Sequence, residues 1–277
     1  MNEHWAKAGA DLIEPLVAEV ARLGGLAESQ IADCVDAITR RDVPLAQAVV
    51  ARDPKLDALQ ADIERKAIEL IATRQPVGRQ LRRTVAGMKI AMNLERCGDL
   101  ARNIAKRTVV LSESEPLTPI TRSIGRMGKL VASRLKDVLD AYSASDLEKA
   151  AAVWARDEEV DEHYNSLFRE LLTYMMGDPR TISPGAHLLF IAKNLERIGD
   201  HATNIAEIIH FEITGEDTMG DRPQWDALQS APHRLEPLES DLIRAQARTP
   251  ELVRPEPVKP QVLKPQAMKP QALKKEV

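Results

Sequence analysis

The apolar and polar positions between Trp5 and about Ile213 follow the pattern of long amphipathic helices separated by short breaks. At three of the breaks, Asp42, Thr118 and Ser183 stand just before a proline, which is typical of a helix start. We predict six helices, over residues 3–39, 43–73, 78–111, 118–142, 146–176 and 184–214. At 1.5 Å per residue these helices are rods of about 40–50 Å. Because short loops connect them, successive helices should run antiparallel, as in an up-and-down bundle.

Composition agrees with an all-helical fold. Hydrophobic residues make up 44% of the 277 residues but aromatic residues only 3%, so Ala, Leu, Ile and Val supply the core. The net charge of −4 excludes a general attraction to nucleic acid.

The two cysteines, Cys34 and Cys97, are too few for a disulfide framework or a cysteine zinc site. With no secretory signal in residues 1–10 and no run of 18 apolar residues, we expect a soluble cytoplasmic protein.

The chain changes character after Gly215. Residues 216–277 contain nine of the seventeen prolines and end in a Lys-Pro-Gln repeat. Such a segment has little apolar surface to bury, so we predict a disordered tail. From Pro257 onward it carries five lysines against one glutamate, which suits either a purely solubilising role or contact with an acidic partner or anionic lipid.

An internal repeat decides the predicted architecture. Residues 91–105 and 192–206 are identical at eleven of fifteen positions, and residues 48–57 match 152–161 at six of ten. The two matches occur in the same order, as in a tandem duplication. We therefore predict an all-α fold of two three-helix repeats, residues 1–112 and 113–215, followed by the tail, 216–277.

Acidic pairs recur at matched positions of the two repeats. Each pair is spaced four residues apart, which places both carboxylates on one face of a helix. Like charges held together in this way favour a hard cation such as Mg²⁺, Mn²⁺, Ca²⁺ or iron. Because their faces lie away from or beside the apolar stripe, we expect surface or edge sites, the alternative being an ordinary solvated charged face. The pairs are Asp53 and Asp57, Glu95 and Asp99, Asp157 and Asp161, and Glu196 and Asp200.

Other matched positions have simpler interpretations. Gly98 and Gly199 lie inside predicted helices, where glycine costs about 1 kcal/mol relative to alanine, and we attribute them to close packing. Cys97 corresponds to Ile198 and should be a core residue. His201 corresponds to Leu100, so a surface position is expected for it.

With these residues in view, the chain resembles the PhoU family. The resemblance rests on the doubled Asn-Leu-Glu-Arg-x-Gly-Asp motif at residues 93–99 and 194–200, supported by the loop at 178–182, and it covers about residues 1–216. It implies an accessory protein of the Pst phosphate transporter, acting at the inner face of the membrane. Its implied partners are the transporter's nucleotide-binding subunit and a PhoR-type histidine kinase, and its implied role is to hold the phosphate-starvation response off.

The resemblance also implies a homodimer and multinuclear metal clusters, with iron, zinc, manganese or magnesium as the ions. In this chain the family's metal motifs map onto the eight acidic residues named above. Pro54 departs from the family pattern, because an interior proline tends to kink a helix. We therefore expect the first-repeat site to be disturbed and the second-repeat site to be preferred.

Two further hypotheses stay open. A carboxylate-bridged di-iron enzyme would need Glu-x-x-His pairs facing the core, which this sequence lacks, so we expect no enzyme activity. A metal-free scaffold with solubilising acidic faces would share the same fold and partners, and the sequence does not separate it from the metal-binding adaptor.

Overall fold

The computed structural model describes the chain from Asn2 to Glu216, and this part is helical throughout apart from short connections. The helices are α1 (Asn2–Arg40), α2 (Val43–Arg74), α3 (Arg79–Leu111), α4 (Thr118–Ala144), α5 (Leu147–Trp154), α6 (Glu158–Gly177) and α7 (Ile182–Thr214). A short 3-10 helix, Pro179–Thr181, joins α6 to α7. Within this part of the chain, every helix falls short of the length and apolar character needed to cross a membrane.

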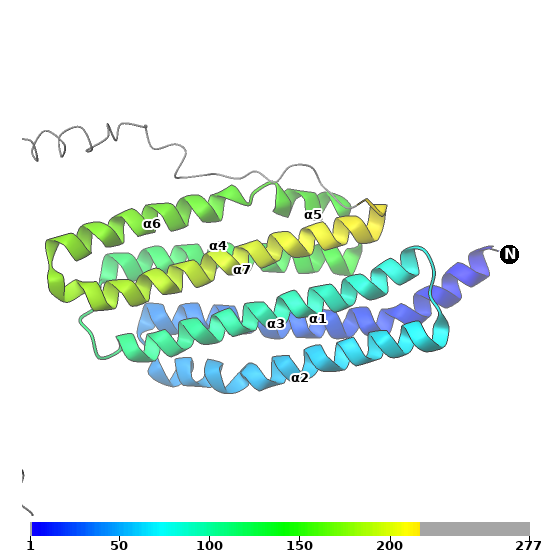
Figure 1. Ribbon diagram of the computed structural model, residues 1–277, viewed down its shortest axis with the longest axis horizontal. Coiled ribbons are helices and arrows are strands. Elements are labelled where there is room, and N and C mark those ends of the chain that lie inside the picture. The colour runs from blue at the N-terminus through cyan, green and yellow to red at the C-terminus, as the bar shows by residue number, and fades with distance from the viewer. Residues whose placement is uncertain (1, 217–277) are drawn as a thin grey trace, which may run out of the picture. The chain divides into compact units, whose positions relative to one another are not determined.

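The described helices form two repeats that lie side by side, with three helices in the first and four in the second. In the first repeat α1, α2 and α3 pack on one another, and in the second α4 and α7 pack with α5 and α6. The repeats meet where α3 lies along α7 and α1 lies along α4 (Figure 1). The predicted all-α architecture of two tandem repeats is therefore confirmed.

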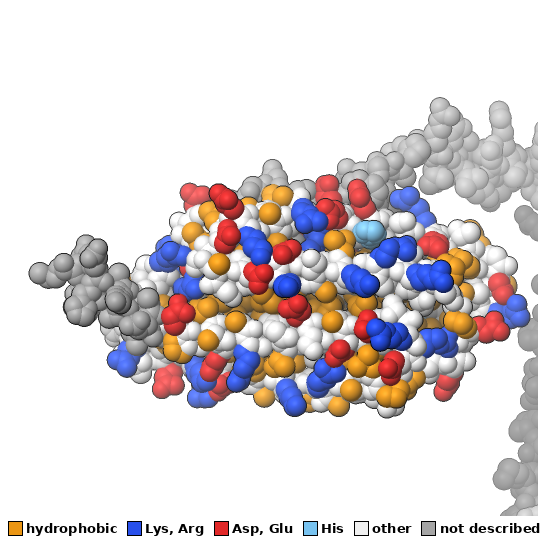
Figure 2. All heavy atoms as spheres, turned by 180° about the vertical axis from the view of Figure 1, so that it is seen from behind, with side chains coloured by type: hydrophobic (Ala, Val, Ile, Leu, Met, Phe, Trp, Pro, Cys, Tyr) orange, Lys and Arg blue, Asp and Glu red, His pale blue; other side chains and the backbone are white. Residues whose placement is uncertain are grey.

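The core consists of the apolar stripes that the sequence pattern predicts. Along α3, the fully buried side chains include Ile90, Leu94 and Cys97. The equivalent residues of the second repeat, Ile191, Leu195 and Ile198 of α7, are fully buried too. The assignment of Cys97 to the core is confirmed. The face opposite to that of Figure 1 carries intermingled acidic and basic side chains, with apolar ones between them (Figure 2).

Close packing accounts for both helix-interior glycines. A Cβ atom at Gly98 would lie 2.5 Å from Cδ2 of Leu56, and one at Gly199 would lie 3.3 Å from Cγ1 of Val160. Leu56 of α2 and Val160 of α6 hold matching positions in the two repeats. Each glycine thus lets an apolar side chain of the neighbouring helix approach the backbone of α3 or α7.

Pro54 does not interrupt its helix, and the preference expected for the second-repeat site stays a prediction. Helix α2 continues through Pro54, whose ring lies on the exposed side of the helix, where its loss of one main-chain hydrogen bond is tolerated. The break falls in the second repeat instead, at residues 155–157, so that the predicted helix 146–176 is divided into α5 and α6. Main-chain hydrogen bonds between residues three apart, such as that from Asp157 N to Trp154 O at 3.3 Å, replace the α-helical bonds between residues four apart at this point.

The three predicted helix starts differ in their caps. Asp42 caps α2 as predicted, since its carboxylate accepts a 2.9 Å hydrogen bond from Leu45 N. Helices α4 and α7 begin after Leu117 and Thr181, and neither of these residues makes a side-chain cap. Helix α4 therefore begins with a proline in its first turn, and the Thr118 hydroxyl does not cap it.

Candidate functional site

The first acidic cluster, defined as Asp53 and Asp57 of α2 with Glu95 and Asp99 of α3, lies where these two helices pack. Asp53 is buried, Glu95 and Asp99 are half-buried, and Asp57 is exposed. Partial burial raises the pKa of Asp57, and the charges of Asp53 and Asp99 raise it further. The pKa of Glu95 is raised by burial and then by Asp99. The structure therefore brings the four predicted carboxylates of this repeat into electrostatic contact.

Arginines balance much of this charge. The guanidinium of Arg102 contacts Asp53 and lies 2.8 Å from Asp99 Oδ1. Arg96 lies 3.5 Å from both Glu95 and Asp99. The Asp53 Oδ1 atom is buried and has no hydrogen-bond partner among the described residues. The first cluster is thus a carboxylate group already occupied by two cationic side chains.

The second acidic cluster, defined as Asp157, Asp161, Glu196 and Asp200, lies at the corresponding contact between the start of α6 and α7. Burial raises the pKa of Asp200 to about 7, and the charges of Glu196, Asp157 and Asp161 add to this shift. Burial raises the pKa of Asp161 too, with further contributions from Glu196 and Asp157. Four carboxylates again share one site.

Fewer cations face the second cluster. Lys193 contacts Glu196, and its ammonium also lies 5.1 Å from the Tyr164 ring. The other oxygen of Glu196, Oε2, is buried without a hydrogen-bond partner in the described part of the chain. An excess of buried negative charge with an unsatisfied carboxylate oxygen is the condition under which a protein site gains most from a cation.

The buried aspartate of each repeat has a different partner. In the first repeat Arg102 pairs with Asp53, whereas in the second Thr203 donates a 2.7 Å hydrogen bond to Asp157 Oδ1. Arg102 and Thr203 are equivalent in the internal alignment, 101 residues apart. The sequence-based prediction of site residues missed Arg102, Thr203 and Lys193. The alignment that revealed the repeat contains all of them, at positions where the repeats differ.

The donor set fits a hard cation in the second cluster better than in the first. Its carboxylate and hydroxyl oxygens are the ligands that such ions prefer. As they are placed, however, the described His, Cys, Asp and Glu side chains, those of residues 13–216, include no group of three that converges as a ready-made ligand set. Metal binding by the eight predicted residues therefore stays a prediction, and an ion would have to draw the side chains of the second cluster together.

His201 lies at the surface of a groove and is partly covered there. It is half-buried, and its Nδ1 atom lies 2.8 Å from Asn93 Oδ1 of the other repeat. Burial lowers its pKa, and the charges of Arg96 and Arg197 lower it further. His201 lines a groove of about 580 Å³ between residues 85–96 of α3 and 201–211 of α7, here called the α3/α7 groove.

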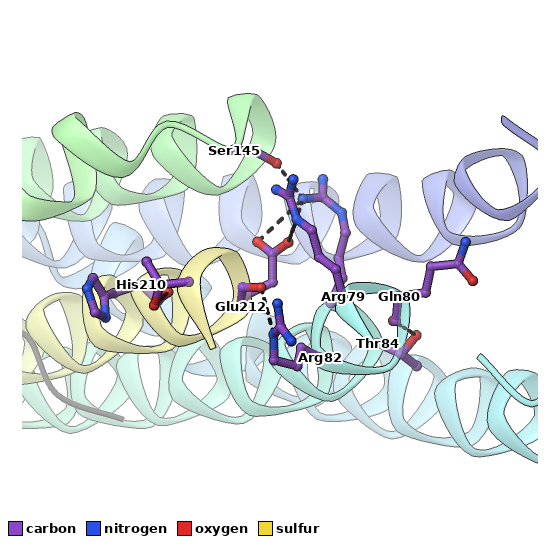
Figure 3. A network of polar contacts seen from close by, with 9 residues as sticks. Arg79, Gln80, Arg82, Thr84, Ser145, His210 and Glu212 are labelled. Carbon is purple, nitrogen blue, oxygen red and sulfur yellow. Dashed lines mark hydrogen bonds and ion pairs between the residues drawn. The ribbon is translucent and has the colours of Figure 1, made fainter. Parts of the chain in front are cut away.

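A buried ionic network fastens the two repeats at the end of this groove. Glu212 of α7 is fully buried and lies 3.1 Å from Arg79 Nε and 3.4 Å from Arg83 Nη1. Arg82 donates a 3.1 Å hydrogen bond to the Glu212 main-chain carbonyl, and Arg83 donates to Ser145 Oγ at 2.5 Å. Figure 3 shows Arg79 and Arg82 at the start of α3 reaching across to Glu212 near the end of α7. The network therefore joins α3, α7 and the connection between α4 and α5.

Fold and site together define a tandem-repeat helical protein with one acidic cluster in each repeat. The PhoU domain model matches the chain twice, at residues 20–108 and 124–209, which together span more than half of its length. The chain belongs to the PhoU family. The resemblance stated from the doubled motif is thereby confirmed.

Similar proteins agree with this assignment. The chain is 66% identical over 228 residues to the phosphate-specific transport system accessory protein PhoU homolog of Caulobacter vibrioides, covering 82% of this chain and 99% of the relative. It is 46% identical over 225 residues to the homolog of Rhizobium meliloti, covering 81% of this chain and 95% of the relative. The names of these relatives describe an accessory protein of a transport system.

Solved structures match the fold. The crystal structure of PhoU from Pseudomonas aeruginosa superposes with a TM-score of 0.70 at 35% identity, covering 75% of this chain and 99% of that one. The phosphate transport system regulatory protein PhoU from Streptococcus pneumoniae gives a TM-score of 0.70 at 30% identity, covering 76% and 98%. The predicted disordered tail lies, from residue 217 onward, outside the described residues.

Proposed function

We propose that this protein regulates phosphate uptake and holds the phosphate-starvation response off when phosphate is plentiful. It acts as a cytoplasmic adaptor at the inner face of the membrane, between the nucleotide-binding subunit of a Pst-type transporter and a PhoR-type histidine kinase. The names of relatives at up to 66% identity support the link to phosphate transport. The coupling to the kinase and the assembly as a homodimer belong to this proposal.

The second acidic cluster carries the metal-binding part of the proposal. Asp161, Glu196 and Asp200 share one site with Lys193 as their close cation, and Glu196 Oε2 lacks a partner in the described part of the chain. These residues, with Asp157, would hold an iron, zinc, manganese or magnesium ion. A bound ion would supply positive charge that offsets their repulsion and would hold α6 against α7. The adaptor is thus a metal-binding helical scaffold with no enzyme activity.

Metal content is tested on the full chain purified without a His-tag or chelator. Elemental mass spectrometry of the wild type should show stoichiometric metal, and Glu196→Ala should lose most of it. Glu95→Ala, the matched change in the first repeat, should lose less, because Arg102 and Arg96 already occupy that cluster. Folded wild-type protein that takes up none of the four ions on titration would contradict metal binding and favour the metal-free scaffold.

The regulatory role is tested separately in cells. Deleting the gene should raise alkaline phosphatase activity in phosphate-rich medium, and the wild-type gene supplied in trans should lower it again. Unchanged phosphatase activity after deletion would count against the regulatory role, whatever the metal content of the protein. A Glu196→Ala gene that complements fully would show that regulation does not require the second cluster.

A further inference from the structure

The α3/α7 groove is an apolar depression with charged side chains at its border. Met92, half-exposed, lies on its wall with Ile208 and Phe211. Lys89, Arg96 and Glu207 also line the groove. The position equivalent to Met92 in the second repeat is Lys193. The first repeat therefore exposes a methionine at a site where the second repeat carries a charge.

Basic side chains follow α3 along this groove. Residues 79–94 contain four basic and no acidic residues. Arg79 and Arg83 are matched by Glu212, but Arg82 and Lys89 form no ion pair with a carboxylate of residues 13–216, the part of the chain whose side chains are described. The side of α3 that leads from the end of α7 into the groove thus has positive charge available for an acidic ligand.

The chain that follows α7 has the complementary chemistry. Residues 217–229 contain three aspartates and one arginine, so their net charge is −2, and their apolar residues include Trp225 and Leu228. A tryptophan flanked by an acidic residue, here Asp226, suits an apolar depression with a lysine at its border that pairs with no described carboxylate. The lysine-rich stretch after Pro257 lacks this complementarity.

The segment begins beside the groove and is long enough to enter it. Helix α7 ends at Thr214, one turn beyond Phe211 on the groove wall. From Gly215 to His201 the helix spans about 21 Å at 1.5 Å per residue. The ten residues from Gly215 to Trp225 can reach about 33–36 Å when extended. Trp225 can therefore contact any part of the groove of its own chain.

The segment lies beyond the residues that the family model matches, since that match ends at residue 209. We propose that residues 217–229 bind in the α3/α7 groove of the same chain, with Trp225 against Met92 and Asp226 near Lys89. The bound segment covers the face where the two repeats meet and competes there with other proteins. This inference does not depend on the proposed role in phosphate regulation.

Photo-crosslinking of the full chain tests the proposal. The variant Trp225→p-benzoylphenylalanine, mixed as light and heavy isotope forms, should crosslink within single chains to residues 85–96 or 201–211. Adding Met92→Glu should lower that yield at least threefold. Met176→Glu, a matched change at a methionine 80% exposed on α6, should leave it unchanged.

Each alternative result overturns the proposal. Crosslinks found only between light and heavy chains would assign the groove to a second copy. Crosslinks spread over the surface, an absence of crosslinks, or equal yields in the two glutamate variants would show that the segment has no site in the groove. The variant Leu263→p-benzoylphenylalanine gives the background expected of a nonspecific tail.

Discussion

Thr203 occupies in the second repeat the position that Arg102 occupies in the first, and each contacts the buried aspartate of its own repeat. The duplicated scaffold is therefore electrostatically unequal. In the first cluster a guanidinium offsets the charges of Asp53 and Asp99, whereas in the second a neutral hydroxyl donates to Asp157 and leaves its negative charge in place. This difference, independently of Pro54, gives a reason to predict that a cation prefers the second site.

Exchanging these two residues should exchange the metal preference of the clusters. Thr203→Arg places a guanidinium beside Asp157 and should weaken metal binding to the second cluster at least about tenfold, which corresponds to about 1.4 kcal/mol. Arg102→Thr should strengthen binding to the first cluster, because it frees Asp53 and Asp99. Isothermal titration with Mn²⁺ measures both changes.

Thr173→Arg is the control for added charge, since Thr173 lies exposed further along α6. It should bind metal as the wild type does. Should Thr203→Arg fail to fold, Arg102→Thr still tests the argument from the other repeat. Unchanged affinities in both variants would show that these cations do not compete with a metal.

The stability of the metal-free protein should fall as pH rises through about 7. The pKa of Asp200 is raised to about 7 in the folded protein from its ordinary value of 3.8, so between these values the folded state binds more protons than the unfolded state. The stabilising proton is then lost as pH rises. Thermal unfolding in chelator from pH 5 to 8 should show this decline, and Asp200→Asn should remove most of it.

Metal affinity should change in the opposite direction with pH. Because a ligand carboxylate must lose its proton, affinity should rise about tenfold per pH unit below pH 7. Asp140→Asn, at an exposed aspartate of α4, should leave both pH profiles unchanged. A flat stability profile in the wild type would contradict the shared site at Asp200.

The sequence predicts the helices because they depend on the local periodicity of apolar residues. It predicts the repeat because two distant segments are largely identical. It also predicts which carboxylates gather, since matched pairs on neighbouring helices must meet. The helix break at residues 155–157 could not be predicted, because neither proline nor glycine marks it. The Glu212 network was equally hidden, since its partners lie about 130 residues apart and come together only when the repeats pack.

The two interior glycines should respond unequally to alanine. Alanine gains about 1 kcal/mol of helix propensity at either position. At Gly98 the new methyl would overlap Leu56 at 2.5 Å, and overpacking of this kind costs about 1–3 kcal/mol. Gly98→Ala should therefore lower the free energy of unfolding, whereas Gly199→Ala, with 3.3 Å to Val160, should leave it unchanged or raise it. Urea unfolding measures both, and equal effects would contradict the packing argument.

Glu212→Gln should destabilise the protein more than the loss of a surface ion pair does. The change leaves Arg83, whose side chain is only 15% exposed, without its carboxylate, and breaking a buried pair costs about 3 kcal/mol or more. Asp36→Asn removes the exposed pair with Arg40 and should cost less than about 1 kcal/mol. Urea unfolding compares the two variants.

The double variant Glu212→Gln/Arg83→Met separates charge from packing. Since it removes the buried cation together with its partner, it should recover much of the stability that Glu212→Gln loses. Arg79, whose side chain is 52% exposed, can turn to water in either background. Equal costs for Glu212→Gln and Asp36→Asn would instead mean that apolar packing of α3 on α7 holds the repeats together without the ionic network.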